Sequence, residues 1–284
     1  MQAALPSRTA LRVALRRAAH QLYDPPPLVF DDPFAVRILG PHAGELERTP
    51  GRVAEHKPRP YSAGLRALLV ARSRLAEDVL RGSVAAGVSQ YVVLGAGLDT
   101  FAHRNPYPEL RVFEVDHPAT QAWKQELLHS AGLPQPACLT NIPVDFECQS
   151  AGDELRSAGW NPAAPTFFSW LGVVPYLTLE AFRSTLTFLA HQPTGSGVAF
   201  DYGQPRSVLP HLEQLAFDSL SARVELAGEN FKLFFTPPQL ASELAAFKGI
   251  EDLGAPDLNA RYFADRRDDL RLRGKAPRIV HAWV

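Results

Sequence analysis

The stretch YVVLGAGLDTFAHR, which runs from Tyr91 to Arg104, decides the fold of this chain. Four apolar residues lead into Gly95-Ala96-Gly97, and Asp99 and Thr100 follow. Glycine lets the backbone turn sharply and lets a ligand approach without a Cβ in the way. The pattern is typical of a buried strand that ends in a tight turn. The turn either lies below a ligand, such as a dinucleotide or a phosphate, or simply joins a strand to a helix.

The residue at position 100 narrows the choice of ligand. A dinucleotide fingerprint, GxGxxG, would place its third glycine there. This chain has Thr100 at that position. The sequence therefore does not support a full pyrophosphate cradle.

Bulk composition excludes several classes of protein. The chain has 284 residues, of which 46% are hydrophobic and 21% charged, and this balance is typical of a soluble globular protein. The net charge of −1 predicts no nucleic-acid partner, and no apolar run approaches the ~20 residues that span a bilayer. Cys138 and Cys148 form no CxxC pair, so we expect free thiols, no metal site and a cytoplasmic location.

The chain is organised in two parts. Residues 1–60 contain helical segments broken by prolines, which predicts a helical cap or lid. Within this part an amphipathic helix is expected, with one apolar side formed by Leu11, Leu15, Ala18, Ala19 and Leu22. Residues 61–284 alternate helices with short apolar strands, which predicts one α/β unit with a mostly parallel sheet.

The alternation predicts a doubly wound, seven-stranded sheet. The expected strands are 90–94, 110–115, 138–144, 166–170, 197–202, 249–253 and 278–283. The expected helices are 62–80, 118–131, 152–158, 179–191, 208–226 and 237–246. Such a sheet binds its ligand at the carboxyl ends of its strands, near the point where the strand order reverses.

Acidic residues follow the second and third strands. Glu114 and Asp116 point to the same face, and an acid about 20 residues beyond a glycine turn commonly binds ribose hydroxyls. Position favours Asp116 over Glu114, although Asp116 could instead cap the helix that begins at Pro118. Asp145 and Phe146 suit an adenine ring, and the alternative is that Asp145 is an ordinary loop acid.

One arginine lies on an apolar helix face. Arg72 falls in the middle of the stripe formed by Leu65, Leu68, Leu69 and Leu75. A buried guanidinium requires an anionic partner, because an unpaired buried charge is very costly. That partner is either a ligand carboxylate or an acid of the cap.

Together these positions suit a ligand with a carboxylate, a ribose and an adenine but no pyrophosphate. S-adenosyl-L-methionine fits this description, and NAD fits less well. The segments ALLVARSRLAEDVL, YVVLGAGLDTFAHR, VFEVDHP and PVDF, in this order, resemble the leucine carboxyl methyltransferase family, especially its bacterial branch. The resemblance covers roughly residues 60–205, with a weaker match in RRAAHQLYDPP and FDDPFA.

The resemblance implies an α/β fold of the class I methyltransferase type, with 61–284 as the S-adenosyl-L-methionine-binding domain. It implies that Arg72 holds the methionine carboxylate and that Gly95 and Gly97 lie against the methionine portion. Asp116 matches the ribose-binding acid, and Arg17 matches a basic cap residue that also reaches the cofactor.

Two further positions depart from the family pattern. Asp145 and Phe146 match an Asp-Leu pair beside the adenine, with phenylalanine in place of leucine. After the fourth strand the family often has a glutamate, and the matching residue here is Leu171. The resemblance therefore supports cofactor binding better than it supports any particular acceptor.

The expected chemistry is in-line transfer of a methyl group to a small molecule or peptide. A carboxylate acceptor is already ionised and needs no base, whereas a hydroxyl acceptor needs one. His20, His103, His117 and Asp201 are candidates, but none carries a catalytic signature. The alternatives are an NAD(P)-dependent oxidoreductase and a catalytically idle S-adenosyl-L-methionine-binding protein.

Overall fold

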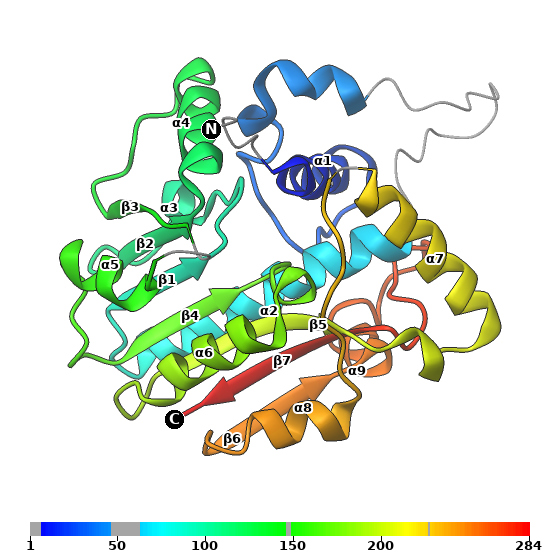
Figure 1. The fold of residues 1–284 in the computed structure, drawn as a ribbon. Coiled ribbons are helices and arrows are strands. Elements are labelled where there is room, and N and C mark those ends of the chain that lie inside the picture. The colour runs from blue at the N-terminus through cyan, green and yellow to red at the C-terminus, as the bar shows by residue number, and fades with distance from the viewer. Residues whose placement is uncertain (1–6, 47–62, 146–148, 227) are drawn as a thin grey trace.

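The computed structural model describes residues 7–46, 63–145, 149–226 and 228–284. Its centre is a seven-stranded sheet with the order β3-β2-β1-β4-β5-β7-β6 (Figure 1). The strands are β1 (Gln90–Leu94), β2 (Arg111–Asp116), β3 (Leu139–Pro143), β4 (Thr166–Trp170), β5 (Gly197–Gly203), β6 (Gly249–Leu253) and β7 (Pro277–Trp283). The predicted doubly wound sheet of seven strands is confirmed.

The order of the strands creates a switch point beside β1. From β1 the chain moves outward to β2 and β3, and it then returns to pair β4 with the other edge of β1. Strands β1 to β5 are parallel, whereas β7 runs antiparallel between β5 and β6. The glycine turn that follows Leu94 therefore lies where a doubly wound sheet binds its ligand.

Helices cover both faces of the sheet. They are α1 (Arg8–Tyr23), α2 (Ala63–Ala85), α3 (Phe101–Arg104), α4 (Pro118–Ser130), α5 (Ala151–Ser157), α6 (Leu179–Ala190), α7 (His211–Glu225), α8 (Pro237–Glu243) and α9 (Ala255–Tyr262). Helices α5, α6 and α8 pack on the face that contains Val92 and Phe113. Helices α2, α3 and α9 pack on the opposite face, because successive side chains of a strand point to opposite sides.

The N-terminal segment packs against helix α4. Helix α1 and the 3₁₀ segment η1 (Arg37–Leu46) form an apolar cluster with α4. Leu15, Ala18 and Ala19 of α1 are buried there as predicted, whereas Leu22, in the last turn of the helix, is 52% exposed. The proposed boundary at residue 60 lies outside the described residues, and the division into cap and core stays a prediction.

Most differences between prediction and structure concern short elements and element ends. The short helices α3 and α9 were not expected, since four and eight residues give too little apolar periodicity to recognise. Helix α2 extends to Ala85, five residues beyond its predicted end. No helix in the described parts of the chain is long and apolar enough to span a membrane.

Candidate functional site

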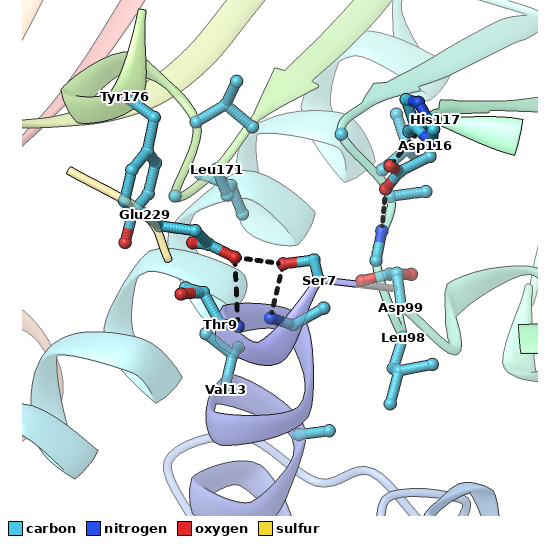
Figure 2. Close-up of a pocket in the computed structure, with 18 of the residues that line it drawn as sticks. Ser7, Thr9, Val13, Leu98, Asp99, Asp116, His117, Leu171, Tyr176 and Glu229 are labelled. Carbon is cyan, nitrogen blue, oxygen red and sulfur yellow. Dashed lines mark hydrogen bonds between the residues drawn. The ribbon is translucent and has the colours of Figure 1, made fainter. Parts of the chain in front are cut away.

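A cavity of about 530 Å³ opens at the carboxyl ends of β1, β2 and β4. Its walls are the glycine turn, the end of β2, the segment after β4, the start of α1 and residues 228–232 after α7. Figure 2 shows 18 of the residues that line it. This is the edge of the sheet at which the sequence predicts a ligand.

The glycine turn is tightly constrained. Gly95 has φ +71°, and a Cβ placed on it would lie 2.3 Å from Cγ2 of Val173. Gly97 has φ +50°, and its Cβ would lie 3.2 Å from the Cβ of Ala10 in α1. The N–H groups of Gly95 and Ala96 both donate to the carbonyl oxygen of Val115, at 2.8 and 3.1 Å. Only glycine at both positions keeps the backbone close to the cavity and to its neighbours.

Asp116 lies at the end of β2 and faces this turn. Its Oδ2 accepts a hydrogen bond from the Gly97 N–H at 2.5 Å, and its Oδ1 accepts one from the His117 N–H at 2.6 Å. Burial raises the pKa of Asp116, although these two N–H groups favour its charged form. The residue that caps α4 is His117, whose Nδ1 accepts from the Ala119 N–H, so Asp116 is not the side-chain cap.

Arg72, a buried residue of α2, forms an ion pair within the protein. Nη1 of Arg72 donates to Oδ2 of Asp201 at 2.9 Å, and the other oxygen of Asp201 accepts from the Gly172 N–H at 2.5 Å. The structural ion pair left open by the sequence therefore exists. Its acid comes from β5, however, and not from the cap, so that part of the expectation was wrong. Arg72 also lines the cavity, where it is 7% exposed.

A buried ionic network lies below the glycine turn. Arg17 of α1 pairs with Asp32, and its Nη2 donates to Oγ1 of Thr100 at 2.8 Å. The Thr100 hydroxyl donates to Asp32 at 2.8 Å, and Arg104 pairs with Glu77 of α2. Burial alone would raise the pKa of Asp32, but Arg17 and Arg104 outweigh it and hold that pKa below its ordinary value. The network thus joins α1 to the turn through Thr100, the residue that replaces the third glycine.

The opposite wall of the cavity was not predicted. Oε1 of Glu229 accepts hydrogen bonds from Oγ of Ser7 at 3.0 Å and from the Thr9 N–H at 3.4 Å (Figure 2). Tyr176 lies on the same wall, and burial is the main cause that raises its pKa to about 12. Ser7 and Glu229 are 222 residues apart in the chain, so no local sequence pattern could have linked them.

Four of the six predicted cofactor-binding residues line this one cavity: Arg72, Gly95, Gly97 and Asp116. Asp145 is not among the lining residues; its N–H and carbonyl oxygen bond with Gln149. Phe146 lies outside the described residues. Cofactor binding by all six stays a prediction, and the structure brings the first four together.

The candidate bases are distributed differently. His117 lines the cavity, whereas Asp201 is engaged by Arg72 and Gly172. His20 is buried and paired with Asp24, and burial lowers the pKa of His103, which is not a lining residue. The Leu171 side chain lines the cavity at the position where the resemblance implies a glutamate. Within the described ranges, no three His, Cys, Asp or Glu side chains gather in a way that could hold a metal ion.

Comparisons with known proteins agree with this architecture. The family model of the leucine carboxyl methyltransferases matches residues 10–190. A Bacillus subtilis protein named "Putative S-adenosyl-L-methionine-dependent methyltransferase YktD" is 33% identical over 290 residues, which cover 93% of each chain.

Solved structures share the fold. A Thermobifida fusca protein titled a "putative methyltransferase" matches with a TM-score of 0.55 and 18% identity, covering 92% of this chain and 98% of the other. A DUF574 family protein of Streptomyces avermitilis matches with a TM-score of 0.53 and 19% identity, covering 88% of this chain and 96% of the other. The predicted fold and family are thus confirmed: the chain belongs to the leucine carboxyl methyltransferase family.

Proposed function

We propose that this chain is an O-methyltransferase that uses S-adenosyl-L-methionine to methylate a carboxylate or hydroxyl oxygen of a small molecule or peptide. Methyl transfer and its methyl donor follow from the family and from the relatives named above. One structural observation supports the site most strongly. The strand-end acid Asp116 and the glycine turn border the same cavity and are hydrogen-bonded to each other.

The residues present suit S-adenosyl-L-methionine. Gly95 and Gly97 border the cavity with backbone alone, and Asp116 places a carboxylate beside them for the ribose hydroxyls. Arg72 supplies a guanidinium at the cavity for the methionine carboxylate. Thr100 is fully buried in the network with Arg17 and Asp32, so the turn does not provide the third glycine of a pyrophosphate cradle. Asp145 and Phe146 remain the predicted contacts of the adenine.

The bound donor supplies a methyl group on a positively charged sulfur. The protein contributes position and a dry environment, because a displacement in which opposite charges cancel is favoured away from water. Val13, Leu171 and Val173 are apolar side chains of the cavity that exclude water from its walls. A carboxylate acceptor needs no further help, whereas a hydroxyl acceptor needs a group that takes its proton.

Calorimetry on the purified chain tests this function. We expect S-adenosyl-L-methionine and S-adenosylhomocysteine to bind at one site per chain and NAD not to bind. Tritiated S-adenosyl-L-methionine incubated with cell extract should then label an acceptor. Binding without any labelling would favour a catalytically idle protein, and binding of NAD in place of S-adenosylhomocysteine would favour an oxidoreductase.

A further inference from the structure

A carboxylate stands in the cavity on the wall opposite Asp116. Glu229 belongs to the segment that follows α7, and this segment is held in place at two points. At the first point, Oε1 of Glu229 accepts hydrogen bonds from Oγ of Ser7 and from the N–H of Thr9 at the start of α1. Backbone bonds from Lys232 and Leu233 to the carbonyl oxygen of Pro175, at 2.7 and 3.2 Å, fix the other end of the segment. Among the described residues no hydrogen bond to Oε2 is found, so this oxygen is available to a ligand.

The groups around Glu229 give this wall its chemical character. The ring centroids of Tyr176 and Phe231 lie 5.3 Å apart. Tyr176, Val13 and Leu171 line the same cavity (Figure 2). An aromatic molecule is suited to such a wall, because flat apolar rings pack well against tyrosine and aliphatic side chains.

Tyr176 is a hydrogen-bond donor here and not a base. Burial, together with the charges of Glu229 and Asp201, raises the pKa of Tyr176 to about 12, so its hydroxyl stays protonated at neutral pH. The other charged groups near this wall are Arg72, which is paired with Asp201, and the exposed Lys232. Glu229 is therefore the carboxylate on this wall whose Oε2 can accept a hydrogen bond from a ligand hydroxyl.

We propose that Glu229 is a catalytic base and that the acceptor of this enzyme is an aromatic hydroxyl compound. This inference rests on the proposed function and names its substrate class. The phenolic O–H proton passes to Oε2 of Glu229 while the oxygen forms a bond to the methyl carbon. The bond between that carbon and sulfur breaks, and its electron pair stays on sulfur, which becomes a neutral thioether.

Charge decides between the two acceptor classes. A carboxylate acceptor would bring a second negative charge to the wall that holds Glu229, and like charges in a partly buried site repel strongly. A phenol arrives neutral, with a pKa of about 10, and can donate a hydrogen bond to the carboxylate. Lys232 offsets this repulsion little, since an exposed ammonium is screened by water and salt.

The test compares two ligands of the same shape. The full chain is first saturated with S-adenosylhomocysteine, and 4-ethylphenol and 4-ethylbenzoate are then titrated separately by calorimetry. We expect the phenol to bind at least tenfold more tightly. Glu229→Gln should narrow this ratio at least fivefold by improving the binding of the benzoate, because the amide removes the negative charge but still accepts from Ser7 and Thr9.

Turnover and a control variant separate a chemical role from a structural one. With 4-ethylphenol and tritiated methyl donor, Glu229→Gln should lower kcat at least 100-fold and abolish the rise of kcat with pH, while the affinity for S-adenosylhomocysteine changes less than twofold. Ser7→Ala loosens the same tether but keeps the carboxylate, so it should retain the ligand preference and the pH profile.

Several results would overturn this assignment. They are benzoate binding as tight as phenol binding, no binding of either ligand, a bound phenol that the unmodified enzyme does not methylate, and equal losses in Glu229→Gln and Ser7→Ala. If S-adenosylhomocysteine itself does not bind, it is the proposed function that fails, and the calorimetric experiment shows this before either aromatic ligand is added.

Discussion

The two ends of the cavity are built in different ways. The end at Asp116 comes from residues 95–117, and its hydrogen bonds join a strand end to the turn of the neighbouring strand. The end at Glu229 combines the start of α1, the segment after β4 and the segment after α7, through contacts that span up to 222 residues. The first end consists of the turn backbone with the side chains of Asp99, Asp116 and His117, whereas the second consists of side chains from α1 and from two loops.

This difference has a functional meaning. Sites on strand ends are held rigidly by the sheet, and loops carry the groups that vary with substrate. We therefore propose that the donor binds at the Asp116 end and the acceptor at the Glu229 end. The predictions below test whether the first end is as rigid, and as specific for the donor, as its construction implies.

Removal of the buried guanidinium below the turn should have the largest effect. Arg17→Met removes the nearer of the two cations that pair with the buried Asp32 and leaves only Arg104, at 3.7 Å. Loss of one partner of a buried pair costs about 3–5 kcal/mol of unfolding free energy. Urea denaturation measures this loss. As a control, Arg183→Met removes a solvent-screened surface pair with Glu243 and should cost far less. Equal losses in the two variants would show that the network does not support the turn.

A methyl group on the glycine turn should have the next largest effect. Gly95→Ala introduces both strain at positive φ and a clash with Val173, so we expect a loss of about 2–4 kcal/mol and loss of donor binding. Gly132→Ala is the matched control. Gly132 has φ +63° but no atom within 4 Å of its Cβ position, so backbone strain alone should cost about 1 kcal/mol. Thermal unfolding and calorimetry would measure the losses of stability and of donor binding in the two variants. Equal losses would show that the Val173 side chain moves aside at little cost.

Loss of the strand-end carboxylate should affect binding more than folding. We expect Asp116→Ala to weaken S-adenosyl-L-methionine binding by well over tenfold, because the ribose hydroxyls lose their acceptor. The exposed acid Asp153 provides the comparison, and Asp153→Ala should leave the dissociation constant unchanged. If calorimetry gives the same affinity for folded Asp116→Ala as for the unmodified chain, Asp116 serves only to position the Gly97 and His117 backbone.

The pH dependence of binding should show a smaller effect. Burial raises the pKa of Asp116, so this group gains its proton at a higher pH than an exposed aspartate does. Protonation removes part of its capacity to accept hydrogen bonds from the sugar. The affinity for S-adenosylhomocysteine should therefore fall as the pH drops through this raised pKa, and the fall should be absent in Asp116→Asn. The same slope in both proteins would assign the titration to another group.

The parts that sequence could predict are those encoded by local patterns. The strands follow from short apolar runs that alternate with helical segments. The glycine turn and Asp116 follow from their spacing within a stretch of about 25 residues, and the structure brings both to one cavity. Arg72 was recognisable as a buried charge on a helix face. Its partner Asp201 lies 129 residues away, however, and only the packing of β5 beside the end of β4 reveals the pair.

The parts that sequence could not predict depend on tertiary contacts. Nothing around Glu229 marks it as a cavity residue, because a short loop has no periodicity and its position is set by bonds to Pro175 and to the start of α1. The role of Thr100 was equally hidden. Its presence indicated that a glycine was missing, but the hydroxyl's bonds to Arg17 and Asp32 appear only once α1 is folded against the turn.

A crystal structure of the chain with S-adenosylhomocysteine tests the central claim most directly. The account predicts the ribose hydroxyls within hydrogen-bond distance of Asp116, with the sulfur directed toward the wall that carries Tyr176 and Glu229. A complex in which the adenosyl group lies outside this cavity, or in which the sulfur faces away from that wall, would contradict it.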